Sequence, residues 1–284
     1  MAARWPSGRI KLRGCSARAV YVTPQLAAEY SALAEDYSRL WAPVIKPMGL
    51  PLLDMLPLAQ AREILDVGAG TGEHFEDLRR RAPHAHIVGV DRSAGMLQIA
   101  QARGARRVAV MDAQRLAFRN AAFDLAVCVF VLFHLPDPVG ALRELHRVLR
   151  PGAHIGAVTW GEDPGTPGAA IWRDALDAAG AAPDPRHPSI MQHSRMDTEA
   201  KLKGLLDEAG FMAVHAQSKC AEHRFTASSL LSVQLYCGLA SRRMPSLPPE
   251  QRARCRAQVE DRLSGLSAEE LVYRPEVIFA IARR

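Results

Sequence analysis

The sequence predicts an α/β protein built on one parallel sheet that is covered by helices on both faces. Between residues 62 and 160, short apolar runs of strand length alternate with amphipathic segments of helical length. Strands that are apolar along their whole length are typical of parallel sheets, because both faces of such a sheet are buried. The chain has 284 residues, of which 48% are hydrophobic, which suits one large domain or two small ones.

Helical spacing dominates the first part of the chain. From residue 21 to residue 57, apolar side chains recur every three or four positions, and four prolines divide the segment into short pieces: Pro43, Pro47, Pro51 and Pro57. We expect residues 21–60 to form an N-terminal helical lid. Residues 1–20 hold five basic residues and no acid, although the net charge of the whole chain is only +6. We interpret this basic tail as disordered, with a targeting presequence as the alternative.

The alternating part and the segment after it divide into strands and helices in a regular order. Strands are predicted at residues 64–67, 87–91, 108–112, within 123–133, and at 155–160, 211–217 and near the end of 271–284. Helices are predicted after the first strand up to residue 81, and at 93–104, 139–150, 169–179 and 198–209. Pro151 and Gly152 are expected to close the helix that ends at residue 150. Residues 225–270 are expected to form a largely helical insertion.

Three glycines follow the first predicted strand, in the stretch ILDVGAGTGEH at residues 64–74. Dinucleotides prefer the spacing G-x-G-x-x-G, but Glu73 occupies the place of the third glycine of that pattern, where a carboxylate would face the pyrophosphate. A P-loop is excluded, because no G-K-(S/T) follows. A tight turn without any ligand stays open as an alternative, although a turn needs only one or two glycines.

This stretch resembles the first motif of class I S-adenosyl-L-methionine (SAM)-dependent methyltransferases, whose usual form is (D/E)-x-G-x-G-x-G. Asp66, Gly68, Gly70 and Gly72 match the motif position for position. The resemblance implies a Rossmann-like sheet of strand order 3-2-1-4-5-7-6, with the last strand antiparallel. It also implies a methyltransferase domain over residues 61–284 that binds SAM, and releases S-adenosylhomocysteine, at the carboxyl ends of strands 1 and 4.

The resemblance further implies roles for three acids. Asp66 would orient the ammonium group of SAM, Asp91 would accept hydrogen bonds from both ribose hydroxyls, and Asp112 would meet the adenine amino group. Ribose recognition by an acid is shared with NAD enzymes, and Asp112 has a turn cap as its alternative role. The other residues expected around the cofactor are Tyr37, Ala69, Arg92, Met96, Ala113 and Val129. For Met96 and Tyr37, packing in the core or between helices stays open.

The acceptor side of the site is predicted around the end of the fourth strand. His134, in the stretch FVLFHLPD, is the first candidate for a side chain beside the methyl acceptor, as a base or an orienting donor. Its alternative role is to tie down the loop. Trp160 is expected either to wall the acceptor pocket or to pack in the core. His187 and His193 are weaker candidates, and Tyr30 lies with Tyr37 where related enzymes fold a helix over SAM.

The acceptor class is narrowed by motifs that the sequence lacks. No (N/D/S)-P-P-(Y/F/W) motif follows the fourth strand, which disfavours the amine methylation of many DNA and protein methyltransferases. The same place also lacks a pair of acids, which disfavours a magnesium-dependent mechanism. We expect transfer to oxygen or carbon of a small, partly apolar molecule by in-line displacement, with no metal and no nucleic-acid partner. The fourth-strand region resembles quinone-biosynthesis and natural-product methyltransferases. An RNA or protein methyltransferase, and a SAM-binding protein without methyl transfer, are the alternatives.

The sequence predicts a cytoplasmic location. The longest apolar run has nine residues, at 125–133, which is too short for a membrane span, and no secretory signal is expected. Five scattered cysteines without C-x-x-C argue against disulfides and a zinc site. The pattern of residues does not indicate an oligomeric state.

Overall fold

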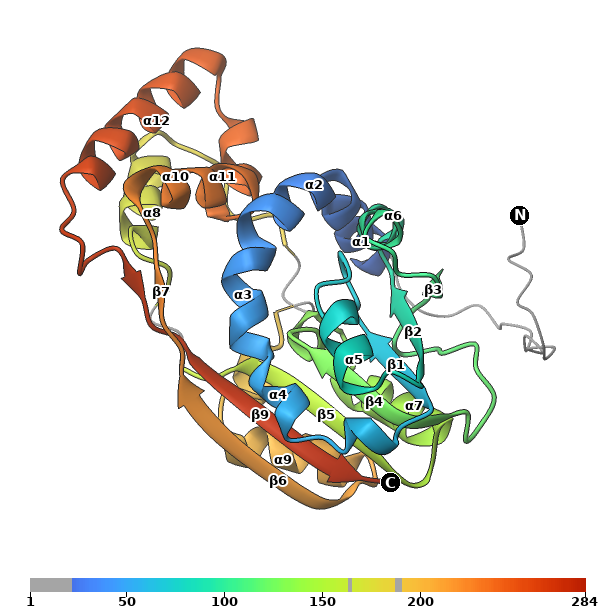
Figure 1. Ribbon diagram of the computed structural model, residues 1–284. Coiled ribbons are helices and arrows are strands. Elements are labelled where there is room, and N and C mark those ends of the chain that lie inside the picture. The colour runs from blue at the N-terminus through green and yellow to red at the C-terminus, as the bar shows by residue number, and fades with distance from the viewer. Residues whose placement is uncertain (1–21, 163–164, 187–190) are drawn as a thin grey trace.

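A seven-stranded sheet crosses the molecule in the computed structural model, which describes residues 22–162, 165–186 and 191–284 (Figure 1). The basic tail and His187 lie outside the described residues. The strands of the sheet are β1 (Glu63–Val67), β2 (His86–Asp91), β3 (Val108–Val110), β4 (Phe123–Val129), β5 (Leu149–Trp160), β6 (Met212–Cys220) and β9 (Glu276–Arg283). A second, two-stranded sheet pairs β7 (His223–Arg224) with β8 (Val272–Tyr273).

The strand order of the main sheet is β3-β2-β1-β4-β5-β9-β6. Neighbouring strands from β3 to β5 are parallel, whereas β9 runs antiparallel to both β5 and β6. Since β9 is the seventh strand of this sheet along the chain, the predicted order 3-2-1-4-5-7-6 and the antiparallel last strand are confirmed.

Helices cover both faces of the sheet (Figure 1). One face packs against α3 (Ala42–Gly49), α4 (Pro51–Asp54), α5 (Phe75–Arg81) and α6 (Ala94–Ala102), and the other against α7 (Pro138–Val148) and α9 (Glu199–Glu208). Successive residues of β1 alternate between the two cores, since Ile64 belongs to the first and Leu65 to the second. Both side chains are fully buried, as the unbroken apolar pattern of the strand predicts.

The predicted end of the helix over residues 139–150 is wrong. α7 ends at Val148, and Pro151 and Gly152 lie within β5 rather than after the helix. The pairing of β4 with β5 passes from Leu149 directly to His154, so the residues between them form an irregularity in the strand. A bulge tolerates a proline that cannot donate to the ladder and a glycine with left-handed backbone, and Gly152 has a φ of 79°.

The N-terminal helices form as predicted, except at one proline. They are α1 (Val22–Ala32), α2 (Ala34–Asp36), a π-helical turn (Tyr37–Trp41), α3 and α4. Pro47 lies inside α3 instead of ending a helix. Pro47 is the sixth of the eight residues of α3 and lacks the N–H that would donate one intrahelical hydrogen bond, and burial of Val44, Ile45 and Met48 holds the helix to the sheet.

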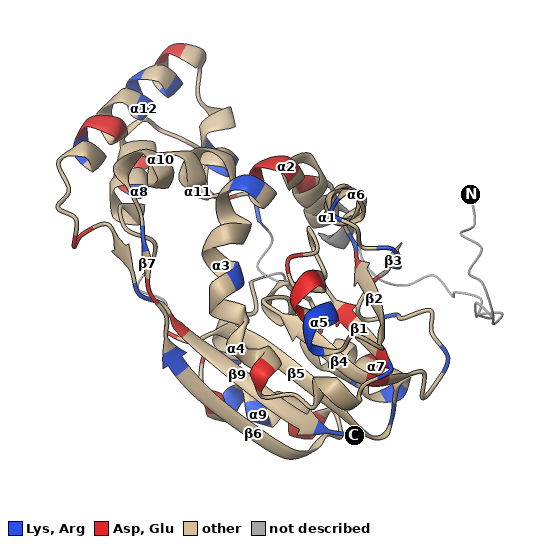
Figure 2. Cartoon of the chain, viewed as in Figure 1, with Lys and Arg blue, Asp and Glu red and all other residues tan. Residues whose placement is uncertain are grey.

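The segment between β6 and β9 is the predicted helical insertion. It contains α10 (Ala227–Tyr236), α11 (Leu239–Arg243) and α12 (Pro249–Ser264), which gather with α8 (Ala169–Ala178) at one end of the molecule (Figure 1). Thr226 and Ser229 form a reciprocal capping box that begins α10. Acidic and basic residues lie side by side on α5 and α12 (Figure 2). None of the helices in the described part of the chain is both long and apolar enough to cross a bilayer.

Candidate cofactor and acceptor site

A cavity opens at the carboxyl ends of β1 and β4, where the strand order reverses. It contains about 780 Å³ of empty space including its open mouth, which is within the usual range for small-molecule sites of about 300–1,000 Å³. Its walls come from α1, the π-helical turn, the glycine turn after β1, the end of β2, residues 111–113 and the segment after β4. This is the position at which open α/β sheets bind their ligands.

Most of the residues expected around the cofactor line this cavity. Those that do are Tyr37, Gly68, Gly70, Asp91, Arg92, Met96, Ala113 and Val129, together with His134 from the acceptor side. The predicted residues that do not line it are Asp66, Ala69, Gly72, Asp112 and Trp160. The structure thus brings the predicted residues to one place, and their contacts with a ligand stay predictions.

The three glycines of the turn have different reasons to be glycine. All three have left-handed backbone, with φ of 70° at Gly68, 52° at Gly70 and 80° at Gly72. A Cβ atom at Gly68 would overlap the side chain of Val131, and one at Gly72 would lie 2.9 Å from Cβ of Ala100. At Gly70 the nearest atom is the carbonyl oxygen of Gly68, 3.9 Å away. Gly68 and Gly72 therefore serve packing, and Gly70 leaves open space on the cavity side.

Asp91 connects the glycine turn to the end of β2. Its Oδ2 accepts a hydrogen bond from the backbone N–H of Gly70 at 2.9 Å, and its Oδ1 accepts one from Ser93 at 2.8 Å. Burial raises the pKa of Asp91, while these backbone hydrogen bonds lower it. A carboxylate has about four acceptor sites, and the backbone N–H of Arg92 also donates to it, so Asp91 keeps about one site for a ligand hydroxyl group.

Asp66 is the buried acid next to this carboxylate. Its side chain belongs to a residue that is 2% exposed, and its Oδ2 has no hydrogen-bond partner among the described residues. Burial raises the pKa of Asp66 to about 7, and the charge of Asp91 adds to the effect. An unpartnered carboxylate in a low-dielectric site is stabilised by a cation, so this position fits the ammonium end of SAM.

Asp112 lies outside the cavity and is already engaged. Its Oδ1 is 2.8 Å from Nη2 of Arg92 and accepts a hydrogen bond from the backbone N–H of Gln114, also at 2.8 Å. The predicted alternative of a turn cap is therefore present in the structure. The cavity wall at this point is formed by Met111 and Ala113.

His134 has a partner that sequence reasoning did not identify. The hydroxyl of Tyr30 lies 3.2 Å from Nε2 of His134, and Tyr37 packs edge-on against Tyr30 with ring centroids 6.0 Å apart. Burial raises the pKa of Tyr30 to about 12, so its phenol is protonated at neutral pH and can donate to Nε2 or accept from Nε2–H, depending on the tautomer of His134. All three side chains line the cavity. Tyr30 and His134 are 104 residues apart, so no local pattern connects them.

Trp160 lies one ring behind the cavity wall. Phe130 forms the wall itself and has a φ of 57°, which is unusual for a bulky residue. Trp160 stacks on Phe130 with centroids 4.1 Å apart, so the predicted alternative of core packing describes its contacts. His193 is outside the cavity, in a short helical turn. The centroid of its ring lies 6.2 Å from that of Phe133.

The glycine turn and the strands around it are similar to known proteins. Residues 65–156 match a family model described as a methyltransferase domain. A ubiquinone biosynthesis O-methyltransferase from Hahella chejuensis is 31% identical over 42% of this chain and 52% of the relative. A demethylmenaquinone methyltransferase from Deinococcus radiodurans is 38% identical over 33% of this chain and 41% of the relative. An aklanonic acid methyltransferase from Streptomyces is 30% identical over 46% and 63%, so the chain spans about half the length of these curated relatives.

Solved structures share the fold over most of the chain. The cyclase SpnF is 18% identical, with a TM-score of 0.58 over 95% of this chain and 99% of its own. A SAM-dependent methyltransferase from Thermotoga maritima, described as a possible histamine N-methyltransferase, is 18% identical, with a TM-score of 0.53 over 90% and 99%. These likenesses concern the fold alone.

Proposed function

We propose that this chain, whose residues 65–156 match a methyltransferase domain, transfers a methyl group from SAM to oxygen or carbon of a small, partly apolar molecule. One observation carries the proposal: the cavity wall presents Asp91 and the open face of Gly70, and Asp66, whose buried Oδ2 has no partner among the described residues, directly precedes the wall residues Val67 and Gly68 in the chain. Together these groups fit a ligand with a cationic end and a sugar.

The cavity offers a separate surface to each part of SAM. Asp66 would hold the ammonium group, Asp91 would accept a hydrogen bond from a ribose hydroxyl, and Met96 and Ala113 would lie against the adenine. When bound, SAM supplies a methyl group made electrophilic by its sulfonium. Val129, which also lines the cavity, would place apolar surface near the methyl end.

Positioning supplies most of the catalysis in this proposal, because in-line methyl transfer needs the acceptor atom opposite the sulfur. His134 would accept the proton of a hydroxyl or enol acceptor, or orient it, at the end of β4. Tyr30 would hold the imidazole ring by accepting a hydrogen bond from Nε2–H, 3.2 Å away, so that Nδ1 is the nitrogen that takes the proton. The ring of Phe130, supported from behind by Trp160, would keep water from this end of the cavity.

The acceptor class is supported by the relatives, whose names describe methylation in quinone and natural-product biosynthesis. Most of the net charge of +6 comes from the five basic residues within residues 1–20, so the rest of the chain offers little electrostatic attraction to RNA. A cyclase has the same fold, however, so the fold alone does not prescribe methyl transfer. A SAM-binding protein without transferase activity is therefore the second candidate.

The test is transfer of label from methyl-labelled SAM to a cell extract. We expect label in small molecules with the wild-type chain and with the exposed control variant Asp207→Ala. Asp91→Ala should reduce it by about 10- to 100-fold, the effect of losing one charge-assisted hydrogen bond to the ligand. Label confined to protein or RNA would favour that alternative, especially if deleting residues 1–20 abolished it. Binding of SAM without any labelled product would favour the non-catalytic candidate.

A further inference from the structure

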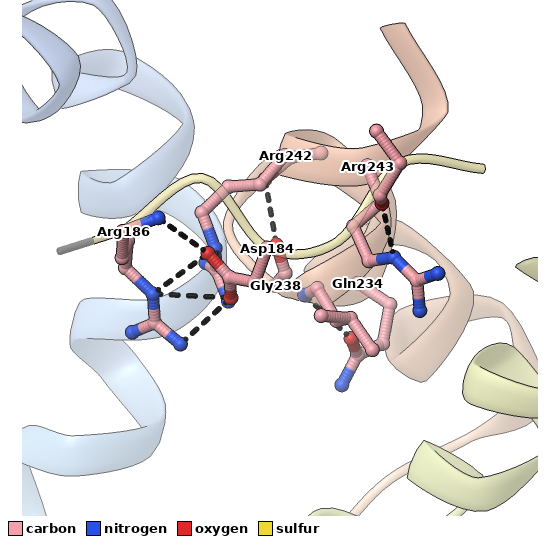
Figure 3. Close-up of polar contacts among 9 residues, drawn as sticks. Asp184, Arg186, Gln234, Gly238, Arg242 and Arg243 are labelled. Atoms are coloured by element: carbon pink, nitrogen blue, oxygen red, sulfur yellow. Dashed lines mark hydrogen bonds and ion pairs between the residues drawn. The ribbon is translucent and has the colours of Figure 1, made fainter. Parts of the chain in front are cut away.

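A cluster of two arginines and one acid lies beside the N-terminal helices (Figure 3). Asp184 accepts hydrogen bonds from Nε of Arg186, at 3.2 Å and 3.1 Å to its two oxygens, and from Nη2 of Arg186 at 2.9 Å. Nε of Arg242, on α11, donates to Oδ2 of Asp184 at 3.1 Å. We call Arg186 and Arg242 the arginine pair. The two guanidinium groups thus share one carboxylate.

The cluster carries an excess positive charge away from bulk water. The side chains of Arg186, Arg242 and Asp184 are 26%, 22% and 21% exposed. Burial and the charge of Arg186 lower the pKa of Arg242, as expected where two cations face one anion. The nearby acid Asp177 is already paired with Arg243 at 2.6 Å. A second anion would therefore balance the charge of the arginine pair.

The arginine pair is held in place by its surroundings. Arg243 donates to the carbonyl oxygens of Ala181 and Ala182 at 3.0 Å and 2.8 Å, which fastens the segment before Asp184 to α11. Gln234, at the end of α10, accepts a hydrogen bond from the backbone N–H of Leu239 at 3.1 Å, which fixes the start of α11. These contacts, drawn in Figure 3, place the guanidinium groups before any ligand arrives.

The arginine pair lies beside the N-terminal helices, close enough to act electrostatically on Tyr30, which lines the cavity. Both guanidinium charges lower the pKa of Tyr30, against the larger effect of burial, so they lie within electrostatic reach of the phenol that contacts His134. Figure 3 shows Arg186 beside the N-terminal helices, which carry Tyr30. Nη1 and Nη2 of Arg242, and Nη1 of Arg186, make no hydrogen bond to another residue in the described part of the chain. They are donors available to a ligand.

We propose that the arginine pair binds a carboxylate of the methyl acceptor, so that the substrate is an organic acid whose reacting atom reaches His134. A planar guanidinium fork matches a carboxylate, and the ligand charge would balance the cluster. The inference rests on the proposed function, because it assigns the acceptor to the same cavity. It adds a specificity site on the loop after α8 and on α11, both outside the sheet.

The first experiment measures binding and needs no knowledge of the acceptor. The chain saturated with S-adenosylhomocysteine is titrated with sodium benzoate or with benzamide, its neutral counterpart, and its melting temperature is followed. We expect benzoate alone to raise the melting temperature. Arg242→Gln and Arg186→Gln should each weaken the benzoate effect about tenfold or more, whereas Arg256→Gln, on the exposed face of α12, should not. Retained binding of S-adenosylhomocysteine shows that each variant is folded.

The outcomes separate this inference from the proposed function. No benzoate effect, equal effects of benzoate and benzamide, or an undiminished effect in both variants would overturn the arginine pair as a carboxylate site. In a second experiment, the product labelled from SAM in extract is passed over an anion exchanger. Label that binds to the exchanger, and that falls about tenfold or more with Arg242→Gln, supports the inference. Label that passes through the exchanger with the uncharged molecules contradicts it. Absence of label counts against the proposed function and leaves the benzoate result to decide the inference.

Discussion

At the scale of the residue, two glycines with the same backbone conformation allow the cost of left-handed backbone to be distinguished from the cost of steric overlap. Gly68 and Gly180 have φ of 70° and 74°, but a Cβ atom at Gly180 would meet nothing within 4 Å. Gly180→Ala should therefore cost only the left-handed strain, about 1–2 kcal/mol of unfolding free energy. Gly68→Ala adds overlap with Val131 and should cost about 3–5 kcal/mol. Urea unfolding measures both, and equal losses would contradict the packing role of Gly68.

Asp66 makes the stability of the ligand-free chain depend on pH. Burial raises its pKa from 3.8 to about 7 in the folded chain, so between these values the folded chain holds a proton that the unfolded chain releases. This contribution therefore destabilises the folded chain as pH rises toward 7. As pH rises across that window, the free energy of unfolding of Asp66→Asn should increase relative to that of the wild type by up to about 4 kcal/mol. Urea unfolding at about pH 4 and about pH 7 checks this, and a constant difference between the two proteins would contradict it.

A cationic ligand should reverse the preference of the same carboxyl group. An ammonium beside Asp66 favours the ionised form, so SAM should bind more tightly as pH rises through about 7 and should release a proton on binding. Calorimetry in two buffers of different ionisation enthalpy counts the protons. Asp66→Asn should release fewer, and identical proton release in both proteins would remove Asp66 from the site.

At the scale of the element, α1 matters because it brings Tyr30 over the end of β4. Tyr30→Phe keeps the ring but removes the hydroxyl that contacts His134. We expect kcat to fall about tenfold, the effect of one hydrogen bond that orients a catalytic group, with little change in the affinity for SAM. Tyr236→Phe, on the exposed side of α10, is the control and should leave both unchanged. Loss of SAM affinity without loss of kcat would mean that Tyr30 only covers the cofactor.

Most elements could be predicted from the sequence because their patterns are local. The apolar run of β1, the Ser93 cap of α6 and the helix–strand alternation depend on neighbouring residues alone. The errors arose where tertiary contacts override a local signal. Pro151 suggested a helix end, but pairing with β4 and β9 draws the surrounding segment into β5. Pro47 suggested a break, but the buried face of α3 continues past it.

At the scale of the whole molecule, the site combines segments that are distant along the chain. The motif residues could be predicted because each follows a strand, and parallel strands end at one edge of the sheet. The contact of Tyr30 with His134 could not be predicted, and neither could the arginine pair. Arg186 and Arg242 meet only through the packing of a loop against α11, and no periodicity records that packing. The proposal for the acceptor side therefore depends on contacts seen in the structure, and the proposal for the cofactor side largely on motifs in the sequence.

The central claim is that the cavity at the ends of β1 and β4 binds SAM, and a ligand titration tests it most directly. The melting temperature of the purified chain is measured with S-adenosylhomocysteine and with NAD, each at about 100 times its dissociation constant or at its solubility limit. We expect S-adenosylhomocysteine to raise it by about 5–10 °C in the wild type, far less in Asp91→Ala, and NAD to leave it unchanged. Equal shifts with both ligands, or none with S-adenosylhomocysteine, would contradict the account.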